Sequence, residues 1–115
     1  MERGTMGNAG AWALLLLAGL FEVGFTTFLR FADGFRNLWP TLGFLAAATL
    51  SFLCLERAAR VIPIGLAYAV WVGIGAVGTI LVGRLFFAEP LSPAQLALVA
   101  VLLAAIIGLR LVTPA

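Results

Sequence analysis

The residue in this sequence best suited to chemistry is Glu22, an acidic residue in the middle of a long apolar run. It lies ten positions after Trp12 and nine before Phe31, near the expected middle of a membrane-spanning helix. An ionised carboxylate there costs at least about 2.5 kcal/mol on insertion scales, and such residues usually mark functional sites. Glu22 is therefore a candidate cation and proton site facing a water-filled cavity. The alternatives are a polar contact between helices or a glutamate kept protonated by its surroundings. The other acidic residues lie at helix ends or in loops: Glu2, Asp33, Glu56 and Glu89.

The chemistry expected of Glu22 follows from desolvation. An apolar setting disfavours the charged form of a carboxylate, so the group can load and release protons. A cation that enters the site favours the ionised form and expels the proton, and the two then compete for one group. If the protein opens to one side of the membrane at a time, this competition couples proton entry to cation exit.

Helical spacing predicts which residues share the face of Glu22, because positions three and four apart are neighbours on a helix. Ala18 and Gly19 are small and leave room. Phe25 can line a cavity, and Thr26 can donate a hydrogen bond. Gly19 also suits close helix packing.

Two aromatic residues and a serine complete the predicted binding site. Tyr68 and Trp71 are three positions apart and so share a helix face, where aromatic rings near a carboxylate suit organic cations. The alternative is an ordinary aromatic packing pair. Ser51, in the middle of an apolar run, is a weaker polar candidate, since a lone serine in a membrane helix often bonds its own backbone.

Small residues form two further patterns. Gly73, Gly75 and Gly78 match a G-x-G-x-x-G string, but no strand precedes it, so a dinucleotide site is rejected. These glycines indicate either close packing or a helix bend. The second pattern repeats at a spacing of four, permits close approach of another helix and predicts a dimer contact, the alternative being a helix that faces lipid. It consists of Ala100, Ala104 and Gly108.

The elements that position these residues are predicted to be membrane helices. The chain is 63% hydrophobic and 10% charged, whereas a soluble domain has about a quarter charged residues. A bilayer core needs roughly 20 apolar residues per helix, and lipid-facing sheets with open edges are excluded. Four segments qualify, at about 12–31, 38–55, 64–87 and 93–111. The fold class is therefore all-α and integral to the membrane. The connections are short, so neighbouring helices are antiparallel and residues 1–115 form one four-helix domain.

The first apolar run could pass for a signal peptide. Because it contains Glu22 and three further spans follow, we expect it to be retained as the first helix. Either Met1 or Met6 fits as the start. Ser92 and Pro93 are a plausible N-cap and first-turn pair for the fourth helix.

The arginines are nearly balanced between the two ends of the predicted bundle. One end carries Arg3, Arg57, Arg60 and Arg110, and the other carries Arg30, Arg36 and Arg84. The positive-inside rule needs an excess on one side, so the balance favours insertion in both orientations and permits an antiparallel homodimer. The alternative is that one extra arginine fixes a single orientation. A net charge of +2 does not suggest nucleic acid, and the absence of histidine and the single Cys54 leave no disulfide framework or ordinary metal site within one chain.

Several motifs, taken together, resemble the small multidrug resistance family over about residues 11–111. They are Gly19-Leu20-Phe21-Glu22-Val23, Phe31-Ala32-Asp33-Gly34-Phe35, Leu38-Trp39-Pro40-Thr41, Ile62-Pro63-Ile64-Gly65-Leu66-Ala67-Tyr68-Ala69-Val70-Trp71 and Gly73-Ile74-Gly75. The resemblance implies an antiparallel, dual-topology homodimer in the bacterial inner membrane that exchanges protons for cations. It implies a transporter rather than an enzyme, with no cofactor. It also implies that both copies of Glu22 form one shared site with Tyr68, Trp71 and Ser51, and that the fourth helix is the dimer contact.

The likeness favours the guanidinium-exporter branch, through the glycine string at 73–78 and the segments at 87–91 and 106–110. That branch usually has a tryptophan three residues after the glutamate, where this chain has Phe25, and a small hydroxyl residue where it has Val72. Thr26-Thr27 is instead similar to the multidrug branch, which exports quaternary ammonium and aromatic cations. Losing polar partners should loosen the grip on a small planar cation, so the substrate range is expected to be altered or broadened.

Two other functional classes stay open at this point. One is a non-transporting subunit that pairs with a different paralogue, against which the balanced arginines argue. The other is a structural or channel-like membrane protein, and Glu22 argues against a purely structural role.

Overall fold

The computed structural model describes residues 7–113 and contains four helices, α1 (Asn8–Ala32), α2 (Leu38–Ala58), α3 (Ile64–Phe86) and α4 (Pro93–Val112). The number of helices agrees with the prediction, and two boundaries differ by more than one residue. Helix α1 begins at Asn8 rather than Trp12, and α2 continues to Ala58 rather than Leu55. Both extensions add residues beyond the apolar core of the segment, where a helix can continue into the headgroup region. Arg3 and the choice between Met1 and Met6 lie outside the described residues.

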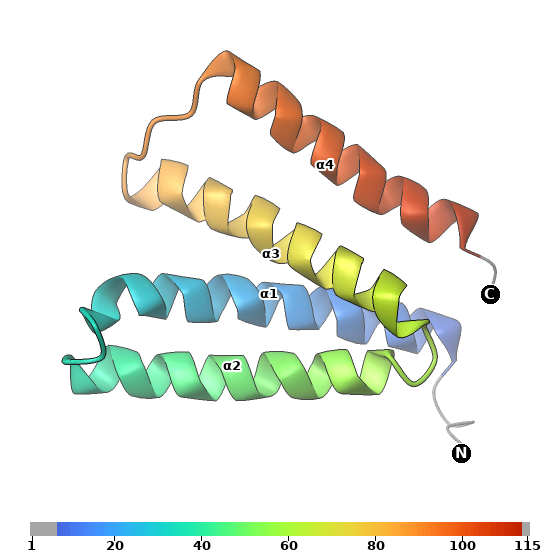
Figure 1. Ribbon diagram of the computed structural model, residues 1–115, viewed down its shortest axis with the longest axis horizontal. Coiled ribbons are helices and arrows are strands. Elements are labelled where there is room, and N and C mark those ends of the chain that lie inside the picture. Colours follow the sequence, from blue (N-terminus) through green and yellow to red (C-terminus); the bar gives the residue numbers. More distant parts are fainter. Residues whose placement is uncertain (1–6, 114–115) are drawn as a thin grey trace.

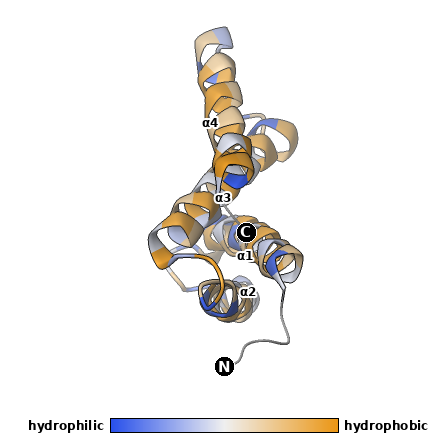
Figure 2. Cartoon of the chain, turned by 90° about the vertical axis from the view of Figure 1, so that its right-hand side faces the viewer, coloured by the Kyte–Doolittle hydropathy of each residue, from blue (hydrophilic) through white to orange (hydrophobic). Residues whose placement is uncertain are grey.

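All four helices are long and apolar enough to cross a membrane. Large apolar side chains such as Leu53 and Leu103 point outward, and Figure 2 shows hydrophobic residues along the whole length of the helices. An exposed apolar surface of this extent suits lipid as the solvent. The described part of the chain therefore has the surface and the helix lengths expected of a protein that crosses a membrane several times.

Helices α1 and α2 form an antiparallel hairpin, and α3 crosses it obliquely, packing mainly on α1 (Figure 1). Helix α4 packs its backbone close to α3 but to neither of the first two helices within the described part of the chain. Its far end reaches α1 through Arg110, whose Cζ lies 5.0 Å from the centre of the Trp12 ring. The backbone of the outer helix α4 is therefore packed against α3 alone among the described elements, while α1, α2 and α3 form the compact part of the molecule.

The core of this compact part combines small and medium apolar residues with the large ring of Trp71. Ala11, Leu15 and Ala18 lie one helical turn apart on α1 and are fully buried. They pack in a cluster with Val70 and Trp71 of α3. The alanines let the helix backbones approach closely. Close approach stabilises helix pairs in lipid, where burial of apolar surface contributes little free energy of association.

The connections at one end of the molecule are shaped by specific caps. Asp33 caps the C-terminal end of α1 in a left-handed backbone conformation with φ of 50°, a conformation that aspartate tolerates. Helix α4 begins with the predicted pair Ser92 and Pro93. The Ser92 hydroxyl accepts from the Gln95 backbone N–H and the Gln95 side chain accepts from the Ser92 N–H, a capping box that defines the start of α4.

Candidate functional site

Glu22 lies in the middle of α1, and its side chain points across the interface to α3. A Cβ atom added to Gly75 would overlap the Glu22 carboxylate, so the glycine is what leaves room for it. The Oε1 atom is buried and makes no hydrogen bond to any residue between 7 and 113. A buried oxygen of this kind is rare in proteins and calls for an explanation such as a bound proton or cation.

The carboxylate lines a cavity of about 370 Å³ between α1, α3 and the α3–α4 connection. Its walls are mostly apolar, with a few polar groups, which is typical of a site for a small organic ligand. The lining residues are Glu22, Thr26, Val72, Gly75, Ala76, Thr79, Ile80 and Glu89. This cavity therefore brings together Glu22 and Thr26, two of the residues predicted from the sequence.

Thr26 and Thr79 connect α1 and α3 beside this cavity. Their hydroxyl oxygens are 2.7 Å apart, and Thr26 Oγ1 also lies 3.0 Å from the carbonyl oxygen of Val23. A hydroxyl has one proton, so if Thr26 donates to Val23, Thr79 must donate to Thr26. The cavity wall at this point is thus a fixed pair of hydroxyls rather than two free donors.

Ser51 and Trp71 form a second hydrogen-bonded unit, on the α2 side of α1. The Trp71 indole N–H donates to Ser51 Oγ at 2.9 Å, and Ser51 Oγ donates to the Ala18 carbonyl at 2.7 Å. Ser51 is fully buried. Its hydroxyl bonds a neighbouring helix rather than its own backbone, and it fixes the orientation of the Trp71 ring.

The aromatic residues of the predicted site lie apart from the cavity that holds Glu22. Tyr68 is 56% exposed, and its ring centre is 5.8 Å from that of Trp71. Phe25 packs against α2, with ring centres 5.7 Å from Phe44 and 6.2 Å from Phe52. Phe25 was expected to line the cavity, and it does not appear among the residues of the cavity wall. Thr26, one residue later, is turned about 100° around the helix axis and takes that place.

The glycines act mainly as packing positions. A Cβ atom on Gly19 would overlap Ile74, one on Gly73 would lie 2.6 Å from Ile106 Cδ1, and one on Gly78 would overlap Val23. Of the two roles predicted for the α3 glycines, close packing is thus present, with Gly73 serving the α3–α4 contact. Helix α3 runs without interruption from Ile64 to Phe86, and a bend at these glycines stays a prediction.

The small residues of α4 lie on a surface that the chain itself leaves open. Ala100 and Ala104 are exposed, and a Cβ atom on Gly108 would meet nothing within 4 Å. Their predicted role as a dimer contact stays a prediction. No three His, Cys, Asp or Glu side chains among residues 7–113 come together in a way that could hold a metal ion.

Sequence reasoning missed two polar residues of the cavity wall, Thr79 and Glu89. Thr79 could have been found, because it lies four positions after Gly75 and therefore on the same face of α3. Glu89 could not, since its place depends on how the α3–α4 connection folds back. Ala88 has a φ of 53° there, and the Glu89 N–H donates to the Gly83 carbonyl at 3.1 Å.

Comparisons with known proteins found a family model and several relatives that match most of this chain. The family model for Small Multidrug Resistance protein matches residues 10–102. Proteins named guanidinium exporter from Citrobacter freundii and Salmonella typhimurium are each 45% identical over 103 residues, which cover 90% of this chain and 98% of theirs. A Bacillus subtilis protein named uncharacterized membrane protein YvdR is 42% identical over 101 residues, covering 88% of this chain and 95% of its own.

Proposed function

Because the chain belongs to the small multidrug resistance family, we propose that it is a proton-coupled antiporter that exports guanidinium-type or other small organic cations across the bacterial inner membrane. The relatives named guanidinium exporters support the cation class. Coupling to protons is our inference from the chemistry of one residue.

The observation that carries the proposal is the buried Oε1 atom of Glu22, which has no hydrogen-bond partner among the described residues and faces a cavity large enough for a small organic cation. An unpaired ionised carboxylate in an apolar surrounding is costly, so the empty site favours the protonated form. A bound cation supplies the missing partner and favours the ionised form. Proton and cation therefore exclude each other from Glu22, which is the requirement for exchange.

Transport of both ligand types by purified protein in proteoliposomes tests the proposal. We expect wild-type protein to exchange protons for guanidinium or for a quaternary ammonium ion, compared side by side. Glu22→Gln should abolish coupled exchange of either cation, because the amide cannot ionise. Binding to the wild type should also weaken as the pH falls, since protons compete with the cation.

Glu56→Gln is the matched control, because Glu56 lies at the exposed end of α2 and pairs with Arg60 at 2.9 Å. This variant should transport like the wild type. Full coupled exchange by Glu22→Gln would rule out the mechanism, and an ionic current without proton exchange would indicate a channel instead.

A second candidate function is export of quaternary ammonium or aromatic cations. The apolar side chain of Val72 in the cavity wall favours it, as does the mutual hydrogen bond of Thr26 and Thr79, which leaves fewer free donors and acceptors for a planar guanidinium. A site whose polar groups are already paired discriminates weakly between cations. The side-by-side transport assay decides between these substrate classes.

We also propose that the working unit is an antiparallel homodimer in which both copies of Glu22 share one site. The single chain supports this, because its cavity contains neither Tyr68 nor Trp71, and because α4 presents an open stripe of small residues. A second copy could supply the missing aromatic wall. A pair formed with a different paralogue would instead predict that each chain has one fixed orientation in cells.

A further inference from the structure

The guanidinium group of Arg30 is bound by both a carboxylate and an aromatic ring. Its Nη1 atom donates to Glu89 Oε2 at 2.8 Å, and its Cζ atom lies 4.0 Å from the centre of the Phe87 ring. A carboxylate and an aromatic face are the two kinds of group that recognise a guanidinium ion. Glu89 and Phe87 therefore form a guanidinium-binding pair whose occupant is part of the protein.

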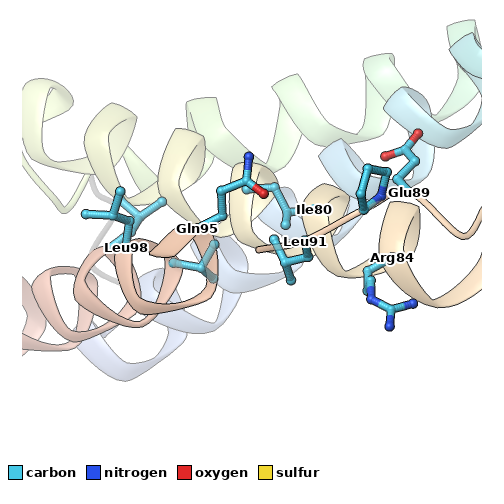
Figure 3. Close-up of a pocket in the computed structure, with 9 residues that line it drawn as sticks. Ile80, Arg84, Glu89, Leu91, Gln95 and Leu98 are labelled. Carbon is cyan, nitrogen blue, oxygen red and sulfur yellow. The ribbon is translucent and has the colours of Figure 1, made fainter. Parts of the chain in front are cut away.

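This pair lies at the outer end of the cavity that holds Glu22. Glu89 lines that cavity and also a smaller one of about 140 Å³, whose wall includes Arg30 and Phe87. Thr26 and Thr79 line both cavities, so polar side chains extend from the inner carboxylate to the outer one. Glu89 also lines a third cavity of about 380 Å³ between α3 and α4, and Figure 3 shows its side chain among those of that cavity wall.

The position of Glu89 is fixed by the backbone. The left-handed conformation of Ala88 turns the chain back after α3, and the Glu89 N–H donates to the Gly83 carbonyl at 3.1 Å. A Cβ atom on Gly83 would overlap Glu89 Oε1, so the missing side chain lets the carboxylate lie against α3. The Phe87 ring packs on Phe31 of α1, with the ring centres 5.5 Å apart. Both halves of the pair are thus positioned without help from Arg30.

We propose that Glu89 and Phe87 form an outer binding site for a guanidinium-type cation at the mouth of the Glu22 cavity, and that Arg30 occupies it as a tethered competitor when no substrate is present. The proposal rests on the proposed function for the class of cation. The side chains of Arg30 and Glu89 are 48% and 52% exposed, and ion pairs this open to water are weak. An incoming cation can therefore replace Arg30 on both the carboxylate and the ring.

The outer site can be measured separately from the inner one by working in full-length Glu22→Gln protein in lipid nanodiscs. The ligand is guanidinium chloride, and binding is followed by isothermal titration calorimetry. Removing the tethered competitor with Arg30→Gln should strengthen guanidinium binding by about threefold. The reason is that the apparent affinity is proportional to the fraction of protein molecules in which the site is free. Adding Glu89→Gln to these two changes should return the affinity to the level of Glu22→Gln alone or below it.

Arg36→Gln in the same background is the matched control. Arg36 lies at the same end of the molecule, but its guanidinium pairs with Asp33 at 3.3 Å. It should leave the affinity unchanged, which separates a specific competitor from a general change in charge. Phe87→Leu, added to Glu22→Gln and Arg30→Gln, should weaken binding by removing the aromatic face.

The outer-site proposal would be overturned if Arg30→Gln left guanidinium binding unaltered, or if the gain persisted after Glu89→Gln. Failure of the proposed function would give a different result. Protein with Glu22 intact would then show no cation binding or transport that depends on Glu22. Circular dichroism and size-exclusion profiles of every variant should match those of the parent, as expected for changes at exposed or half-buried positions.

Discussion

Phe25 lies three residues after Glu22. A tryptophan at this position would add an indole N–H donor, which the phenylalanine ring lacks. The ring packs between Phe44 and Phe52 of α2 rather than along the wall of the Glu22 cavity. A larger side chain at this point must either displace these neighbours or reach toward the cavity with its N–H group. Residue 25 is therefore positioned to influence which cations fit beside Glu22 without lining the cavity itself.

We predict that Phe25→Trp shifts the preference toward guanidinium, because the indole N–H can orient the carboxylate that binds a planar cation. The extra ring atoms should cost about 1–3 kcal/mol of stability where the packing is tight. The measurement is the ratio of guanidinium to quaternary ammonium transport in proteoliposomes. Phe44→Trp is the control, because it adds the same indole on α2 and should leave that ratio unchanged. An unchanged ratio in Phe25→Trp would contradict the prediction.

Single residues could be predicted from the sequence when the signal was local. Glu22 was identifiable because a charged side chain in an apolar run is costly and conspicuous. Ser51 was placed in the middle of a helix, where a lone serine often bonds its own backbone, but its partners, Ala18 and Trp71, come from two other helices. Glu89 was assigned to a loop, and no local pattern could reveal that the loop folds back toward the cavity.

Among the elements, α3 contributes most to the site, because its glycines receive side chains from both neighbouring helices. Val23 lies against Gly78, Glu22 against Gly75, and Ile106 of α4 against Gly73. One face of α3 therefore positions the Glu22 carboxylate, and the neighbouring face of α3 contacts α4.

Gly75→Ala should force the Glu22 carboxylate to move, since the added Cβ atom would overlap it. Overpacking of this kind costs about 1–3 kcal/mol, so we expect cation binding to weaken by at least about fivefold. The assay is guanidinium binding to purified protein. Gly65→Ala is the control, because a Cβ atom at the start of α3 would meet nothing within 4 Å. Equal binding by both variants would show that the carboxylate does not depend on the space left by Gly75.

The boundaries of the elements were predictable where capping chemistry or charge marked them, as at Ser92 and Pro93. Their mutual arrangement was not. Short connections require antiparallel neighbours, but the oblique crossing of α3 over α1 depends on side-chain contacts such as Ile74 on Gly19, which lie far apart in the sequence.

On the scale of the whole molecule, α4 stands out because only α3 supports its backbone (Figure 1). The start of α1 and the end of α4 lie at the same end of the bundle, as expected for an even number of antiparallel spans. The open stripe of small residues on α4 is where we expect the second copy to pack.

Ala104→Leu should weaken the homodimer by about 1–3 kcal/mol, because the larger side chain keeps the helices apart. Energy transfer between separately labelled protomers in liposomes measures the dimer fraction. Ala46→Leu makes the same change at an exposed alanine of α2 and should have little effect. A dimer that tolerates Ala104→Leu as well as Ala46→Leu would place the interface elsewhere.

The pairing of Arg30 with Glu89 joins residues that are 59 positions apart, and this separation matters while the protein is being made. When the first helix enters the membrane, the ribosome has not yet synthesised Glu89, and Arg30 still carries an uncompensated positive charge. Orientation is decided largely by lysines and arginines in the segments next to the early spans, with little contribution from acidic residues. The first loop is therefore more basic during insertion than in the finished protein, and the mouth of the cavity forms only after the end of α3 has been synthesised.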